Sequence, residues 1–564
     1  MGRMPLTLAA IALTVSGADL VLRNGKIVTL DPANPEVTAI AVSRGRIVAA
    51  GSDAQMAPQI LKDTQVINLG GRLAIPGFIE GHGHFAAIGQ SKTELDLRDV
   101  RTWDEIVAVV TVAVREAKPG AWILGRGWHQ EKWDRKPVPE VRGFPVHDAL
   151  STVSPNNPVL LVHASGHAVF VNAAALARAG ISATTRDPPG GEILKDASGN
   201  PTGLLNEAAQ SLANVALQRD LAQRNASEQN AQAEREIDLA ARECLSKGIT
   251  SFEDAGSPPE VIERIRKRAE RGSLPLRLWV MLRTSNDGFR AWIKAHPSRM
   301  IEEADNHVTV RAIKEYMDGA LGSRGAWMLE PYSDLPSSTG LNIQSVADIE
   351  RTARIAIANG YQLAVHAIGD RANREVLNLY ERVFSANRGE TDLRWRIEHA
   401  QHLNPADIPR FAQLNVIAAM QGIHATSDGP MVIPRLGPKR AQEGAYVWRS
   451  LLETGAHIGN GTDAPVEDVS PIQCFYASVT RRMKNGETLY PAQKMTRMEA
   501  LRSYTLENAY AAFEENLKGA LKPGMLGDIT VLSKDILTIS DDELLTAQVD
   551  YTIVGGKVAY QRLK

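Results

Sequence analysis

The sequence has little cysteine, no long apolar run and no excess of positive charge, and each absence excludes a class of protein. Its 564 residues include two cysteines, Cys244 and Cys474, which lie too far apart in the chain to suggest a disulfide framework or a cysteine-based zinc site. No internal stretch reaches the roughly 20 apolar residues of a membrane-spanning helix. The 63 basic and 65 acidic residues nearly balance, whereas an electrostatic nucleic-acid binder carries a basic excess. We therefore expect neither a membrane nor a nucleic acid as a partner.

The composition is that of an ordinary globular protein. Hydrophobic residues make up 44% of the chain and charged residues 23%, which is enough for a sizeable core. The length fits several domains or one large barrel with insertions. With so few thiols, histidine and carboxylate side chains must hold any metal ion.

The first eighteen residues have the layout of a short secretory signal peptide. Residues 1–3 form a basic start, residues 5–15 are apolar and residues 16–18 are small, as at a signal-peptide cleavage site. The alternative is a frayed N-terminus that runs into a strand from Ala18. The first interpretation predicts a periplasmic or secreted protein, and the second a cytoplasmic one.

Both ends of the chain carry patterns typical of β structure. Residues 19–75 alternate short apolar and polar runs, and the pair Asn24-Gly25 between two of them is a strong hairpin signal. Residues 520–564 contain similar runs. We interpret 19–75 and 520–564 as one composite β-sandwich domain, an arrangement that brings the two ends together.

Residues 76–519 alternate strand and helix patterns, which is typical of a parallel sheet. Eight such units predict an α/β fold, a closed TIM-like (β/α)8 barrel. The expected barrel strands are 73–79, 248–254, 276–282, 308–314, 362–366, 395–399, 416–420 and 457–463. The gap between the first two strands far exceeds the roughly 31 residues of a typical unit. We therefore predict an inserted domain over residues 90–225, after the first strand.

A pair of histidines, His82 and His84, ends the first barrel strand. Residues two apart on a strand point to the same side, so both imidazoles can face one metal ion inside the barrel mouth. Four further polar residues end later strands, where barrel active sites lie. They are Lys314, His366, His399 and Asp463. A single histidine in such a place usually belongs to the core, but the combined set predicts a metal centre.

Lys314 has two interpretations. Burial beside metal ions disfavours the charge of an ammonium group, and the neutral amine can capture carbon dioxide to form a carbamate that bridges two metals. Alternatively, Lys314 remains a cation at the barrel mouth and binds a substrate carboxylate.

The motifs resemble the metal-dependent amidohydrolase superfamily and, more narrowly, its family 3 branch, which includes N-substituted formamide deformylases. The resemblance runs from about Ala18 to Val558. It rests on segments 76–84 (PGFIEGHGH), 314–324 (KEYMDGALGSR), 366–370 (HAIGD), 396–401 (RIEHAQ) and 461–466 (GTDAPV). Each piece alone is weak, whereas the set is specific.

The resemblance implies a role for each of these residues. His82 and His84 bind the buried metal ion, and a carbamate on Lys314 bridges to a second one. His366 and His399 bind that second ion, and Asp463 is both a ligand and the catalytic proton acceptor. Two zinc ions are the expected cofactors.

Other residues are expected to contact the substrate. His424 could donate a hydrogen bond to a substrate carbonyl, and the glycine-rich loop that begins at Asp318 could line the pocket. In the insertion, Trp128 could form an apolar wall, while His129 and His167 could roof the site. For each of them, packing within the fold is the alternative.

The leading hypothesis is a metal-dependent hydrolase that cleaves a non-peptide carbon–nitrogen bond, formamide-like or N-acyl, by attack of a metal-bound hydroxide. A small-molecule amide is then the partner, and a homodimer is an open option. The alternatives are a mononuclear deaminase or a cyclic-imide hydrolase. A non-catalytic regulatory relative is disfavoured because all six ligand residues are present.

Overall fold

The computed structural model describes residues 17–223, 225–389 and 391–563. Eight parallel strands form its central sheet, in the order β23-β22-β21-β20-β19-β18-β17-β8. Their bounds are β8 (Phe78–Gly83), β17 (Ile249–Ser257), β18 (Arg277–Leu282), β19 (Val308–Tyr316), β20 (Gln362–Ala367), β21 (Arg396–His399), β22 (Ile417–Met420) and β23 (Ile458–Asn460). The predicted TIM-like barrel is confirmed.

Backbone hydrogen bonds close the barrel between its first and last strands. The Asp463 N–H donates to the His82 carbonyl, and the His84 N–H donates to the Ala464 carbonyl, both over 2.7 Å. This closure places the ends of β8 and β23 side by side, so residues almost 400 positions apart share one site.

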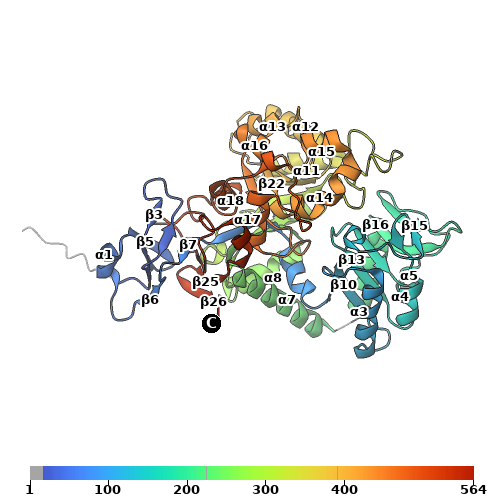
Figure 1. Ribbon diagram of the computed structural model, residues 1–564, viewed down its shortest axis with the longest axis horizontal. Coiled ribbons are helices and arrows are strands. Elements are labelled where there is room, and N and C mark those ends of the chain that lie inside the picture. Colours follow the sequence, from blue (N-terminus) through green and yellow to red (C-terminus); the bar gives the residue numbers. More distant parts are fainter. Residues whose placement is uncertain (1–16, 224, 390, 564) are drawn as a thin grey trace, which may run out of the picture.

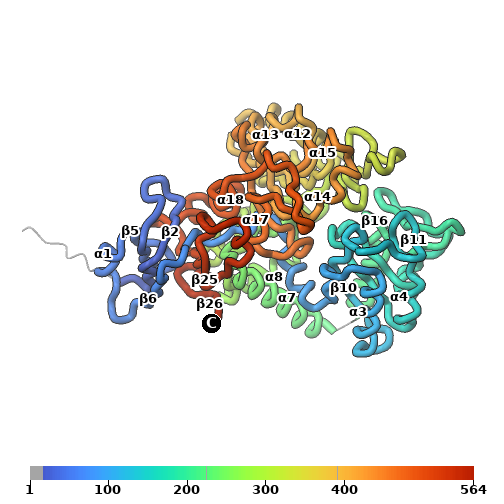
Figure 2. The backbone as a smooth tube through the Cα atoms, in the orientation of Figure 1, coloured from blue at the N-terminus to red at the C-terminus, as the bar shows by residue number. Residues whose placement is uncertain are grey.

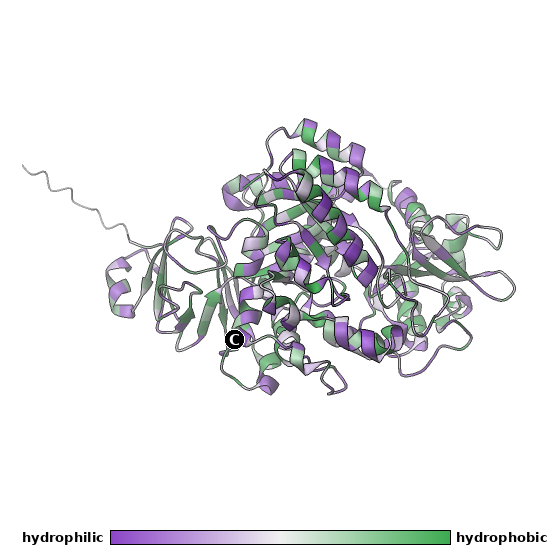
Figure 3. Cartoon of the chain, turned by 90° about the horizontal axis from the view of Figure 1, so that it is seen from above, coloured by the Kyte–Doolittle hydropathy of each residue, from purple (hydrophilic) through white to green (hydrophobic). Residues whose placement is uncertain are grey.

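Helices surround the barrel, and all but one short helix, α10 (Glu303–Asn306), contain buried residues. They are α7 (Ala226–Ser246), α8 (Pro259–Glu270), α9 (Asn286–Ala295), α10 (Glu303–Asn306), α11 (Val346–Ala358), α12 (Asp370–Ala386), α13 (Ile408–Gln413), α14 (Gly422–Leu436), α15 (Pro438–Gly444), α16 (Trp448–Glu453), α17 (Pro471–Thr480), α18 (Arg497–Ser503) and α19 (Leu506–Ala511). In Figure 3 the helices mix hydrophilic and hydrophobic stretches, as expected for amphipathic helices.

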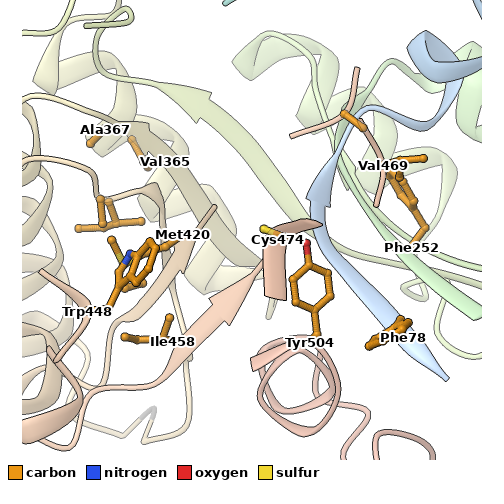
Figure 4. Packing of buried hydrophobic residues seen from close by; sticks show 14 of the residues in the cluster. Phe78, Phe252, Val365, Ala367, Met420, Trp448, Ile458, Val469, Cys474 and Tyr504 are labelled. Atoms are coloured by element: carbon orange, nitrogen blue, oxygen red, sulfur yellow. The ribbon is translucent and has the colours of Figure 1, made fainter. Parts of the chain in front are cut away.

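One continuous core joins strands and helices. Phe78 of β8 packs edge-on against Tyr504, with ring centroids 6.1 Å apart (Figure 4). Trp448 of α16 lies near Met420 and Ile458 in the same view. Both cysteines are buried and free, and within the described residues no helix is long and apolar enough to cross a membrane.

The two chain ends build one β domain from two sheets, as predicted. One sheet has the order β26-β25-β24-β7-β2-β3 and the other β5-β4-β1-β6. Figure 1 shows the blue N-terminal strands beside the red β25 and β26. Their bounds are β1 (Leu20–Arg23), β2 (Lys26–Val28), β3 (Glu36–Val37), β4 (Ala39–Ser43), β5 (Arg46–Gly51), β6 (Gln65–Asn68), β7 (Leu73–Pro76), β24 (Ile529–Leu532), β25 (Val549–Val554) and β26 (Lys557–Gln561). The proposed signal segment falls mainly on residues outside the described part of the chain.

The predicted first barrel strand, 73–79, is wrong in one respect, because it is divided between two sheets. Leu73–Pro76 is β7 of the end domain, and the barrel strand β8 begins at Phe78. Gly77 lies at the crossing, where a Cβ would come within 2.2 Å of the Thr250 hydroxyl. An apolar run shows burial but not which sheet buries it.

An inserted domain follows the first barrel strand and forms a separate lobe, cyan in Figure 1. Its sheet has the order β15-β16-β14-β13-β10-β9. The elements are β9 (Leu95–Asp96), α3 (Trp103–Glu116), β10 (Ile123–Trp128), β11 (Glu140–Val141), β12 (Phe144–Pro145), α4 (Asp148–Val153), β13 (Val159–His163), β14 (Ala168–Val171), α5 (Ala173–Ala179), β15 (Gly191–Lys195), β16 (Pro201–Glu207) and α6 (Gln210–Leu221). Leu161 and Phe170 face one apolar cluster of this domain, and Leu160 and Val169 face another, as the twofold alternation of strands requires.

Candidate active site

The paired histidines converge on one carboxylate oxygen at the barrel mouth. His82 Nε2 lies 3.6 Å and His84 Nε2 3.2 Å from Asp463 Oδ1. Burial opposes ionisation of Asp463, but the hydrogen bond from His84 and the neighbouring imidazoles hold the pKa of its carboxyl well below the usual value. Asp463 is therefore an anion at neutral pH, as a ligand or proton acceptor must be.

His366 and His399 reach the same place from β20 and β21. The His399 ring centroid lies 4.7 Å from that of His82 and 4.5 Å from that of His366. The backbone is left-handed at His399, with φ of 77°, and at Asp463, with φ of 57°. Such positions persist only where the surroundings hold them, and they cluster at functional sites.

The donor atoms of this group fit a divalent metal ion. Ligand atoms of His82, His399 and Asp463 all lie within 4.8 Å of one another. His82 Nε2 and His366 Nε2 are buried and have no hydrogen-bond partner among the described residues. Buried polar atoms without partners are costly, whereas imidazole nitrogen and carboxylate oxygen are good zinc ligands.

Lys314 lies at the same mouth, on β19. Its side chain is buried, and its Nζ is 3.5 Å from the Ala255 carbonyl and 4.6 Å from the centroid of the Tyr316 ring. Burial and the nearby Lys314 together lower the pKa of His82 to about 4. His82 is thus a neutral imidazole, the form that binds metals.

A buried charge network orients His82, and the sequence had not indicated its role. Glu398 bonds His82 Nδ1 through Oε2 and accepts from Arg396 Nε over 2.7 Å. Arg396 also bonds Glu253, and all four side chains are at most 1% exposed. Burial opposes ionisation of Glu398, but Arg396 and His82 hold its pKa well below the usual value. The signal that could have indicated this network was a pair of charged residues, Arg396 and Glu398, at alternate positions of one predicted strand.

A small pocket of about 50 Å³ opens beside these residues, and both the barrel and the insertion line it. His424 of α14 borders it, with Nδ1 2.9 Å from the Gln401 amide nitrogen. Its Nε2 is buried without a hydrogen-bond partner among the described residues. His129 and His167 belong to the insertion and line the pocket, where the sequence had placed them as a cover of the site.

Two predicted substrate contacts are not supported. Trp128 is fully buried in the core of the insertion, where its indole N–H donates to the Leu161 carbonyl over 2.9 Å. The strand alternation turns Trp128 inward, and His129 faces the pocket in its place. Asp318 is also fully buried.

The Asp318 carboxylate does not line the pocket, although its Oδ1 lies 3.5 Å from His366 Nε2, and it binds backbone N–H groups. Its oxygens accept from the N–H groups of Trp327, Ile368 and Gly369 over 2.8–2.9 Å. Burial raises the pKa of this carboxyl to about 7, although these three bonds lower it. The loop that Asp318 opens does line the pocket, through residues 320–322.

Comparison with known proteins agrees with this geometry. A model of the amidohydrolase family matches residues 65–560. The chain is 33% identical to the protein LONG AFTER FAR-RED 3 of Arabidopsis thaliana, over 96% of this chain and 92% of that one. It is 30% identical to an N-substituted formamide deformylase of Arthrobacter pascens, over 96% and 98%. An uncharacterized metal-dependent hydrolase from Pyrococcus horikoshii shares the fold, with a TM-score of 0.74 and 23% identity over 93% of this chain and 99% of that one.

Proposed function

Because the chain belongs to the amidohydrolase family and is a metal-dependent hydrolase, we propose that it hydrolyses a non-peptide carbon–nitrogen bond of a small amide. The observation that carries this proposal is the convergence of His82, His399 and Asp463, with partnerless buried donor atoms at the barrel mouth. The similarity to an N-substituted formamide deformylase supports an amide substrate. The pocket beside these residues would receive the acyl group of the substrate.

The ligand set would be the six residues expected from the sequence, which are His82, His84, Lys314, His366, His399 and Asp463. Lys314, buried at the barrel mouth, would take part as a carbamate. Divalent ions such as zinc would supply Lewis acidity and lower the pKa of a coordinated water.

Asp463 and His424 would carry the proton movements and the substrate contact. Asp463, ionised at neutral pH, accepts a proton from the attacking water and later delivers it to the leaving amine. Gln401 donates its amide hydrogen to His424 Nδ1, so the neutral ring carries its proton on Nε2. His424 lines the pocket, and this nitrogen, which has no partner among the described residues, can donate to the carbonyl oxygen as negative charge develops there.

A screen of amides tests the proposal. Zinc-loaded protein is incubated with N-substituted formamides, N-substituted acetamides and N-acyl amino acids, and the released acid and amine are measured. We expect one of these classes to be hydrolysed, and Asp463→Asn to abolish the activity. Asp541→Asn, which changes an exposed carboxylate paired with Arg497, is the control and should be fully active. No hydrolysis of any amide by the metal-loaded protein would overturn the proposal and favour a non-catalytic role.

A mononuclear deaminase or cyclic-imide hydrolase is the second candidate. The group with mutually close ligand atoms contains His82, His399 and Asp463 without His366, which suits a single ion. Release of ammonia or ring opening of an imide, with one metal ion per chain, would favour this candidate over the amide hydrolase.

A further inference from the structure

The insertion contributes a buried histidine–carboxylate pair to the pocket. His167 precedes β14 and Glu207 ends the neighbouring strand β16, where the Glu207 N–H donates to the His167 carbonyl over 2.9 Å. His167 Nδ1 lies 2.9 Å from Glu207 Oε2. The side chains are 16% and 3% exposed. A charge-assisted hydrogen bond with so little exposure fixes the imidazole strongly.

Glu207 is held in place from both domains. Its φ of 48° is left-handed, a strained conformation that persists only where the surroundings stabilise it. Ser323, in the loop after β19, donates to Glu207 Oε1 over 3.1 Å. A Cβ on Gly319 or Gly325 would come within 2.4 or 2.3 Å of the same oxygen. The loop after β19 therefore has glycines at the two positions that lie against the Glu207 carboxylate.

The imidazole of His167 faces the reacting groups. It lines the pocket with His366, His399 and Asp463, and its ring centroid is 5.3 Å from that of His366. Since Glu207 occupies Nδ1, only Nε2 remains for a ligand. His167 lies on the side of His366, whereas His424 lies on the side of His399, 6.2 Å between ring centroids. Figure 2 shows the insertion beside the barrel, in the region of α14.

We propose that His167 contacts the substrate amide through Nε2, and that Glu207 is a positioning residue that acts through His167. The pair makes the insertion a part of the active site and not merely a roof over it. The inference rests on the proposed function, because it assigns a second hydrogen-bonding residue to the same substrate. Hydrogen bonds to an amide from two sides of the pocket restrict the orientation of the scissile bond more than a single contact does.

A double-mutant cycle on the zinc-loaded full chain tests the proposal. His167→Phe keeps the ring volume and removes Nε2, and Glu207→Ala removes the partner of Nδ1. Each variant should lower kcat/KM for the best amide by about tenfold or more, as the loss of a hydrogen bond to a polar group predicts. The double variant should lose no more than either single variant, because both act through one contact. Zinc content should stay close to that of the wild type, and each variant should remain folded.

One control variant and a substrate pair complete the experiment. Glu192→Ala removes a carboxylate of the same sheet that pairs with Arg142 on the surface, and it should leave kcat/KM unchanged. A loss seen with N-monosubstituted but not N,N-disubstituted amides would place His167 at the amide N–H. An equal loss with both would place it at the carbonyl oxygen, and either result supports the contact.

Other results would overturn the inference. Wild-type kcat/KM in folded, zinc-loaded His167→Phe would show that His167 does not contact the substrate, while the proposed function would stand. Strictly additive losses would show that Glu207 does not act through His167. His167→Gln, which keeps a hydrogen-bonding side chain, replaces His167→Phe if that variant fails to fold, and its kcat/KM should exceed that of His167→Ala. If the wild type hydrolyses no amide, both proposals are wrong.

Discussion

Replacing Glu398 with glutamine should weaken zinc binding without removing any proposed ligand. Glu398 is fully buried, bonds His82 Nδ1, and accepts from Arg396 over 2.7 and 3.1 Å. In Glu398→Gln the amide nitrogen must face either Arg396 or His82, so two donors meet and one of these bonds is lost. Removal of such an outer contact of a metal ligand typically costs 10–100-fold in metal affinity. We therefore expect a loss of about 1.4–2.7 kcal/mol.

The assay is competition for zinc between the protein and a chelator of known affinity. Glu253→Gln is a matched control, because Glu253 is equally buried and bonds the same Arg396 but not His82. Burial raises the pKa of Glu253 to about 7, although Arg396 lowers it, so its carboxyl is only partly ionised near neutrality. This control should bind zinc nearly as the wild type does. If folded Glu398→Gln has wild-type zinc affinity, Glu398 does not orient a metal-binding His82, and the reasoning fails.

Three further predictions concern the ligands and the domain junction. His82→Ala should lose bound zinc and amide hydrolysis together in a folded protein, and a fully metallated, active variant would remove His82 from the ligand set. Lys314→Ala should lose most activity and regain part of it when acetate or propionate is added. Lys314→Arg should not regain activity under the same conditions. An active Lys314→Arg with two metal ions per chain would disprove the carbamate. Asp528→Asn should lower the free energy of unfolding in denaturant by about 3–5 kcal/mol, because it leaves Arg277 buried without its partner. Burial opposes ionisation of Asp528, but Arg277 lowers its pKa. The stability that the Asp528–Arg277 pair contributes should therefore be complete above about pH 4 and disappear as the pH falls further. An equal loss of stability in the exposed control Asp134→Asn would contradict this prediction.

Most of the barrel could be predicted because its strands are short, largely apolar runs that alternate with helix patterns. The runs that end at His366 and His399 fall within one or two residues of β20 and β21. The prediction failed at 73–79, where two successive strands of different sheets form one apolar run through Gly77. Burial determines the hydrophobic pattern of a strand, but hydrogen-bond partners determine its sheet, and these come from distant segments.

The predicted site shows the same limit. The metal-ligand candidates were recognisable because each ends a parallel strand, and the ends of such strands meet at one edge. Glu398 orients His82 across more than 300 positions, a contact that no local pattern contains. The direction of the Trp128 side chain depends on the register of β10 with β13, which shifts between Arg126 and Trp128, and no local pattern contains this register. The pairing of His167 with Glu207 likewise depends on strand order in the inserted sheet.

The most direct test of the account is a zinc titration of amide hydrolysis. Metal-free protein receives zinc in steps, and bound zinc and released amine are measured at each step with the best N-substituted formamide or N-acyl substrate. The account predicts no hydrolysis without metal, a rise in activity that follows zinc occupancy, and no rise in His82→Ala. Full hydrolysis by the metal-free protein, or activity in His82→Ala equal to that of the wild type, would contradict the central claim that this histidine–carboxylate group is a catalytic metal centre.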